Sequence, residues 1–189
     1  MSGHGFHVHG PHDHELEHAA HSNDDFSSKI AVMTAIMATV GALIGYEGGA
    51  TQNQSAMLKN SAAITKTDAA NSWSHYQSKS NKQNLAELAL SIPGVDGEKY
   101  KLDIERYKKE KEVIKKEAEA FEKQVVELEK LSEAALHQHH RWAQSMTAVQ
   151  IAISLAAIAL LTKKKWLEYA SYGVATAGLG IAALAWLHI

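Results

Sequence analysis

Apolar positions are most regular between Glu98 and His140, where they recur at alternating steps of four and three residues. This heptad spacing predicts a long α-helix with one apolar stripe, because residues three or four apart share a helical face. The stripe, with polar breaks at a lysine, a serine and a histidine, consists of Tyr100, Ile104, Tyr107, Lys111, Ile114, Ala118, Phe121, Val125, Leu128, Ser132, Ala135 and His139. Glutamate four positions before lysine stabilises the charged faces. Such a helix needs a partner along its stripe.

Three windows without charged residues lie on both sides of this helix, at 30–46, 142–162 and 169–189. A membrane-spanning helix needs about 20 apolar residues, a length that the second and third windows match and the first approaches. Aromatic side chains, which gather at membrane interfaces, stand at the window edges: Trp142, Trp166, Tyr169 and Trp186. We therefore predict three membrane spans. The alternative is that the windows are the buried core helices of a soluble bundle.

The strongest break in the chain lies at residues 92–97, which contain a Pro-Gly and an Asp-Gly pair. The segments before and after it, 50–91 and 98–140, are each about 60 Å long as helices. Equal arms joined by a tight tip are expected to fold back antiparallel. The sequence thus predicts an all-α membrane protein with three transmembrane helices and a long antiparallel helical (coiled-coil) hairpin between the first and second spans.

These features divide the chain into consecutive segments. They are a His-rich N-terminal tail (1–28), a first transmembrane helix (29–47), an extramembrane helical hairpin (48–141, tip 92–97), a second transmembrane helix (142–162), a short basic loop (163–166) and a third transmembrane helix (167–188). Three lysines in the basic loop should stay in the cytoplasm, because short cytoplasmic loops are enriched in basic residues. We therefore expect a cytoplasmic N-terminus and, in a bacterial inner membrane, a periplasmic hairpin.

Small residues recur at helical spacing in all three windows. Small side chains let helices approach closely in lipid, where packing rather than water exclusion drives association. The candidate packing and oligomer contacts are Gly41, Gly45, Ala148, Ala152, Ala156, Gly173 and Gly178. The alternative is that glycine and alanine are simply common in membrane spans.

Composition excludes several classes of activity. The net charge of −2 with intermixed lysine and glutamate leaves no basic excess for nucleic acid, and the absence of cysteine excludes disulfides and thiolate metal sites. We find no phosphate-binding loop, no nucleophile motif and no paired catalytic acids, so we expect neither an enzyme nor a cofactor. The uncharged windows also argue against an ion-coupled transporter, which usually places ionisable groups in its spans.

Histidines gather in the N-terminal tail, where His14, His18 and His21 would share one helical face and could bind Zn, Ni, Cu or Co. Residues 14–18 also match H-E-x-x-H, but a zincin needs a third ligand and a cleft that excludes solvent. The alternative is adventitious metal binding by a low-complexity tail. A second group, His137, His139 and His140, is expected at the lipid headgroups.

The first arm contains the pattern W-x-x-Y-Q-x-K-S-x-K, formed by Trp73, Tyr76, Gln77, Lys79 and Lys82. This pattern, together with the apolar and basic stretch at 149–169, resembles the bacterial domain-of-unknown-function family 4337 over roughly residues 30–187. The resemblance implies a three-span helical membrane protein and supplies no activity. Trp73 and Tyr76 are three apart and should pack across the hairpin. The alternative is a patch for a partner or ligand.

We therefore expect a non-enzymatic integral membrane protein that lies in a lipid bilayer and forms a homo-oligomer. It would act as a scaffold or assembly subunit that presents the hairpin, with an unidentified membrane protein as a further partner. One rival is an oligomeric channel, lined by polar residues of the spans: Thr34, Thr39, Gln150, Ser154 and Thr176. The other rival is a metal-binding or sensing membrane protein that uses the tail.

Overall fold

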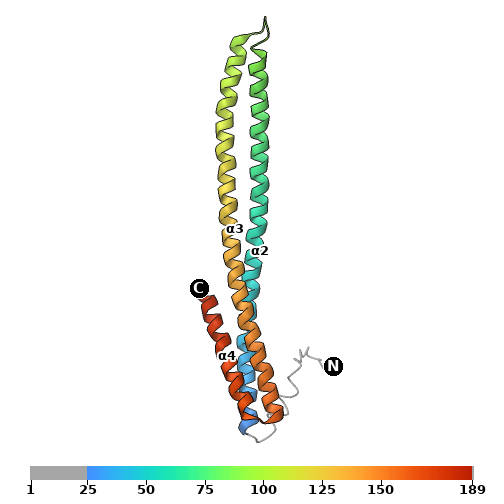
Figure 1. Ribbon diagram of the computed structural model, residues 1–189, viewed down its shortest axis with the longest axis vertical. Coiled ribbons are helices and arrows are strands. Elements are labelled where there is room, and N and C mark those ends of the chain that lie inside the picture. Colours follow the sequence, from blue (N-terminus) through green and yellow to red (C-terminus); the bar gives the residue numbers. More distant parts are fainter. Residues whose placement is uncertain (1–24, 189) are drawn as a thin grey trace, which may run out of the picture. The chain divides into compact units, whose positions relative to one another are not determined.

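The computed structural model describes residues 25–188 and contains three helices (Figure 1). They are α2 (Asp25–Ala89), α3 (Gly97–Thr162) and α4 (Lys165–Trp186), and the described residues contain no strand. The prediction of an all-α fold is confirmed. Long uninterrupted helices follow from a sequence rich in alanine, leucine, glutamate and lysine, with proline only at positions 11 and 93.

The chain turns between α2 and α3 at residues 90–96. Gly94 has a φ of 87°, a left-handed conformation that glycine adopts at little cost. The hydroxyl of Ser91 donates to the carbonyl of Leu88 at 2.7 Å, which satisfies an acceptor at the end of α2. At the start of α3, Asp96 Oδ1 accepts a hydrogen bond from the backbone N–H of Lys99 at 3.3 Å. The break is therefore built from local side-chain chemistry.

Only Lys163 and Lys164 separate α3 from α4. Lys163 has a φ of 53°, which is unfavourable for a residue with a side chain by about 1 kcal/mol. Its N–H donates to the carbonyl of Ala159 at 2.8 Å, so the last turn of α3 is closed before the chain reverses.

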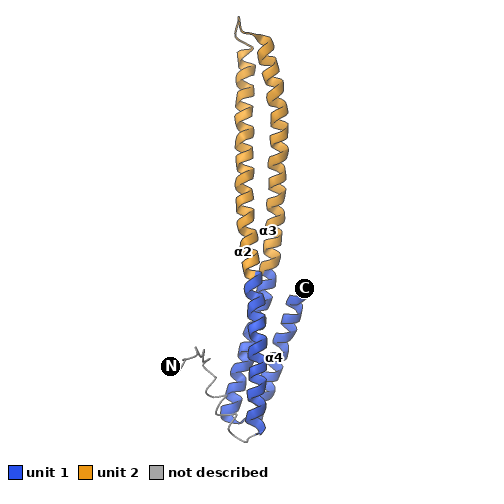
Figure 2. Ribbon diagram, turned by 180° about the vertical axis from the view of Figure 1, so that it is seen from behind, with its two compact units in different colours: residues 1–51, 137–189 blue, residues 52–136 orange. Residues whose placement is uncertain are grey.

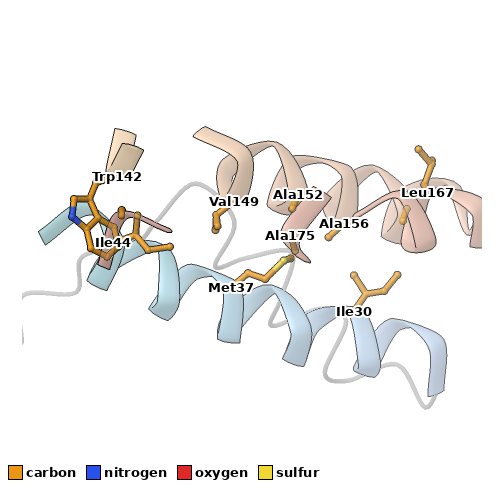
Figure 3. Packing of buried hydrophobic residues seen from close by; sticks show 11 residues of the cluster. Ile30, Met37, Ile44, Trp142, Val149, Ala152, Ala156, Leu167 and Ala175 are labelled. Atoms are coloured by element: carbon orange, nitrogen blue, oxygen red, sulfur yellow. The ribbon is translucent and has the colours of Figure 1, made fainter. Parts of the chain in front are cut away.

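The described chain forms two compact units (Figure 2). Unit 1 contains the described residues of 1–51 and 137–189, and unit 2 contains residues 52–136. In unit 1, segments of α2, α3 and α4 share one apolar core (Figure 3). The core consists of Ile30, Met37, Ile44, Trp142, Val149, Ala152, Ala156, Ala159, Leu167, Ala175 and Ala185.

Hydrogen bonds between α3 and α4 reinforce this core. Ser145 donates to the carbonyl of Gly178 at 2.8 Å, and Ser171 donates to the carbonyl of Ala152 at 2.7 Å. Both serines are fully buried, so their hydroxyls need such partners. These bonds fix the register of the two helices.

Unit 1 also leaves many apolar side chains on its outside, including Val32, Ile36, Leu43, Leu161 and Trp186. Two of the three described helices, α2 and α3, contain a stretch that is long and apolar enough to cross a membrane. α4 is not among them. The third predicted span therefore stays a prediction.

In unit 2, α2 and α3 run antiparallel, because contacts from successive positions of α2 reach progressively earlier positions of α3. Ser55 contacts Ser132, Trp73 contacts Glu122, and Lys79 contacts Glu110. Every position of the α3 heptad stripe within unit 2 is buried or half-buried. α2 faces it with small residues, and the buried apolar positions of the pair are Ala62, Ala69, Ala86, Ile104, Ile114, Ala118, Val125 and Ala135.

Candidate functional site

The candidate site lies in unit 2, where the apolar contact between α2 and α3 gives way to a cluster of aromatic and charged side chains. Trp73 and Tyr76 come from adjacent turns of α2, and their rings meet edge to face with centroids 5.6 Å apart. The indole N–H of Trp73 donates to Glu122 Oε1 on α3 at 2.8 Å. Trp73 thus links the two helices through a hydrogen bond to a carboxylate.

An ion pair lies further along α2 in the same cluster. Lys79 Nζ is 2.7 Å from Glu110 Oε2, and both side chains are half-buried. The hydrogen bond from Lys79 lowers the pKa of Glu110 below its ordinary value of 4.5, and the charge of Arg106 adds to this effect. Because its pKa is lowered, Glu110 stays ionised in neutral solution. Lys79 Nζ also lies 5.9 Å from the centre of the Tyr107 ring.

Arg106 also lies over the Tyr107 ring, with its guanidinium carbon 4.9 Å from the ring centre. It donates to the Tyr107 hydroxyl at 3.2 Å and pairs with Asp103 at 2.9 Å. The hydrogen bond to Tyr107, followed by the charge of Asp103, raises the pKa of Arg106. The two cations near this ring each have a carboxylate partner.

Lys111, the first polar break in the α3 stripe, extends across to α2. Its Nζ donates to Ser80 Oγ at 3.2 Å and lies 5.2 Å from the centre of the Tyr76 ring. A lysine fits at a stripe position here because serine and tyrosine face it instead of an aliphatic side chain. Its long apolar stem covers the contact while its ammonium reaches polar atoms.

A hollow of about 350 Å³ opens beside Lys111. Its lining residues are Tyr76, Gln83, Lys108, Lys109, Lys111 and Glu112. Gln83 donates to Glu87 at 2.7 Å, whereas its Oε1 is buried without a partner among the described residues. Three lysines give the hollow a positive rim, so an anion fits it better than a cation.

The five residues of the W-x-x-Y-Q-x-K-S-x-K pattern separate into two groups. Trp73, Tyr76 and Lys79 are half-buried in the cluster, whereas Gln77 and Lys82 are exposed. Cross-helix packing explains the first group and leaves the second available to other molecules. The partners of the first group on α3 were missed by sequence reasoning, although the polar break at Lys111 was a usable signal. These partners are Glu122 for Trp73, Lys111 for Tyr76, and Glu110 and Tyr107 for Lys79.

Most of the small residues predicted as packing or oligomer contacts pack against neighbouring helices inside unit 1. A Cβ on Gly178 would lie 3.0 Å from Ala148 Cβ, and a Cβ on Gly41 would lie 3.3 Å from Val149 Cγ1. Gly45 faces the end of Met146 at 3.7 Å, while Ala152 and Ala156 are fully buried. Gly173 alone of this set is open, because a Cβ at this position would meet nothing within 4 Å among the described residues. Most of these positions therefore join helices within one chain.

The described part of the chain contains no candidate metal site. His14, His18 and His21, with the H-E-x-x-H match at 14–18, lie outside the described residues. In residues 25–188, no three histidine, aspartate or glutamate side chains are grouped to hold a metal ion. His139 instead contacts the carbonyl of Gly48 at 2.8 Å through Nδ1.

The geometry defines a class: an all-helical protein with two long helices, each of which contains a stretch able to cross a membrane. The chain belongs to the family of the domain of unknown function DUF4337, whose model matches residues 26–188. The resemblance seen in the sequence is thereby confirmed. No curated protein and no solved structure matches the chain.

Proposed function

We propose that the protein is a non-enzymatic membrane scaffold that self-associates through the outer face of α2 in unit 2. Residues 29–47, 142–162 and 167–188 would cross a bacterial inner membrane. Residues 48–141 would form a coiled-coil hairpin in the periplasm, with the N-terminus in the cytoplasm. The abundant apolar side chains on the outside of unit 1 support this placement, because lipid would cover them.

One observation carries the self-association. On the face of α2 that points away from α3, two series of positions recur every seven residues. Neither series contains a charged residue. These exposed positions are Met57, Asn60, Ile64, Thr67, Asn71, Ser74, Ser78, Asn81, Leu85 and Leu88. Four of them are large apolar side chains that are more than half exposed. An uncharged stripe of this length on an outer helix face favours a second helix as its partner.

The charged outer face of α3 favours association through α2 rather than through α3. Lys109, Lys116, Lys123 and Lys130 are exposed and recur every seven residues. Two copies that met through this row would place like charges opposite each other, which destabilises a helix pair. The second copy is therefore expected on α2.

Symmetry sets the register of the proposed contact. Two copies with the same orientation in one bilayer are related by an axis along its normal, so equal positions of α2 meet in parallel. Asn71 would then face Asn71 of the second copy. A buried asparagine at such a position fixes register and limits the number of strands in coiled coils.

Cysteine cross-linking tests this proposal cleanly, because the chain has no native cysteine. We expect Asn71→Cys to form a disulfide dimer when native membranes are oxidised. Lys123→Cys is the matched control, since it neighbours Glu122, the partner of Trp73, at the same level of the pair. Monomer alone for Asn71→Cys, or equal dimer yields for both variants, would contradict the proposed surface.

No specific observation favours the channel. The hydroxyls of Thr34, Thr39, Ser154 and Thr176 each donate to the carbonyl four residues earlier in their own helix. Their protons are thus already used by the helix backbone, which leaves them poorly suited to line a pore.

A further inference from the structure

An apolar groove of about 530 Å³ lies in unit 1 between the start of α2 and α4. It is lined by Lys29, Val32, Met33, Ile36, Met37 and Tyr172. Val32 and Ile36 are about 60% exposed, so no other part of the described chain covers them. From Lys29 to Met37 the groove floor extends about 12 Å along α2. One leaflet of a bilayer core is about 15 Å thick, so the groove matches much of one acyl chain.

Charges of both signs stand at one end of this groove. Lys29 Nζ lies 3.1 Å from Asp25 Oδ2, and both side chains are largely exposed. Glu168 of α4 lies close enough to Lys29 for an electrostatic interaction, and the Tyr172 hydroxyl is 3.5 Å from Glu168 Oε1. Lys29, which lines the groove, is thus paired with the carboxylate of Asp25 and also feels the negative charge of Glu168.

We infer that this groove binds a phospholipid with a zwitterionic amine headgroup, such as phosphatidylethanolamine. The lipid phosphate would pair with Lys29, and its ammonium would pair with Asp25 and Glu168. An anionic headgroup without an amine would meet the two carboxylates unfavourably. The acyl chain would cover Val32 and Ile36.

This inference rests on the proposed placement of unit 1 in the membrane. It goes further in naming a lipid class and a binding position. Lipids that adhere to any apolar surface, or that merely surround the protein, would show no preference between two headgroups when their acyl chains are the same.

The test measures lipids bound to the full-length protein by native mass spectrometry after titration with phosphatidylethanolamine or phosphatidylglycerol. We expect wild type to retain phosphatidylethanolamine preferentially. Ile36→Trp should fill the groove and weaken that binding roughly tenfold. Leu43→Trp is the matched control, because Leu43 is an exposed apolar residue two turns further along α2 that does not line the groove.

A charge variant tests the headgroup part separately. Glu168→Gln should reduce the preference for phosphatidylethanolamine over phosphatidylglycerol about fivefold, since one carboxylate partner is lost. Equal retention of both lipids by wild type, or wild-type binding by Ile36→Trp, would overturn the inference. A benzophenone side chain introduced at Ile36 that cross-links to protein instead of lipid would overturn it as well.

Carbonate extraction of membranes that contain the protein distinguishes failure of the lipid-binding inference from failure of the proposed membrane placement. Wild type that stays in the membrane without a lipid preference would refute only the groove. Wild type released by carbonate would refute the membrane placement and the groove together.

Discussion

For Trp73, the sequence predicted which face of the helix it lies on but not which residue of α3 it contacts. Its spacing from Tyr76 indicated a shared helix face, and both residues are half-buried between α2 and α3. The partner of Trp73, Glu122, could not be predicted, because α3 has a carboxylate or an ammonium at most outer positions. Only the exact pairing register selects among them, and that register depends on the length and conformation of the turn at residues 90–96.

Removal of the indole N–H of Trp73 should destabilise unit 2. We expect Trp73→Phe to lower the free energy of unfolding of the full-length protein by about 1 kcal/mol, because Glu122 loses its donor at 2.8 Å. Circular dichroism during thermal unfolding in detergent measures this change. Tyr46→Phe, which alters an exposed aromatic residue of unit 1, should leave the transition unchanged. Equal transitions for all three proteins would show that the bond contributes nothing.

The ion pair between Lys79 and Glu110 gives a pH dependence of defined sign. Since the pKa of Glu110 is lower in the folded protein, the pair stabilises the fold at pH values above 4.5, and this contribution is lost as the pH falls through the lowered value. Glu110→Gln should therefore be less stable than wild type at pH 7, and the gap should close as the pH falls through the lowered pKa of Glu110. Glu119→Gln, in a looser pair at 3.9 Å, serves as the control. A constant gap across this range would contradict the assignment.

At the scale of elements, the heptad stripe predicted the buried side of α3, since all twelve positions are buried or half-buried. The break between α2 and α3 was also readable from the Pro-Gly and Asp-Gly pairs. The partner face of α2 was harder to read, because alanine, serine and threonine form it and these residues are equally common on exposed faces. The packing of Gly178 against Ala148 is likewise a property of α3 and α4 together, which spacing within one helix does not determine.

The glycines of α4 provide a matched test of this packing. Gly178→Ala would place a Cβ 3.0 Å from Ala148 Cβ and should lower the stability of the protein by about 1–3 kcal/mol. Gly180→Ala meets nothing within 4 Å and should be neutral or stabilise α4 by roughly 0.5–1 kcal/mol. Thermal unfolding in detergent compares the two variants. A neutral Gly178→Ala would show that α3 and α4 are not packed this closely.

At the scale of the whole molecule, we propose that apolar helical segments cross a membrane and that the α2–α3 pair of unit 2 contacts a second copy. α2 and α3 each carry a stretch apolar enough for this role, and the outer faces of unit 2 differ in charge. The sequence predicted the apolar windows because length and composition are local properties. It did not predict that the outer α2 face is the uncharged one, because this requires knowing which face α3 covers.

The central claim is that residues 48–141 lie on one side of a membrane and the loop between α3 and α4 on the other. Single-cysteine variants Val95→Cys and Lys164→Cys, treated in intact cells with a membrane-impermeant maleimide, test it most directly, because the chain has no other cysteine. We predict that Val95→Cys is labelled in intact cells and that Lys164→Cys is labelled only after the membrane is permeabilised. Labelling of both positions in the same compartment would contradict the account.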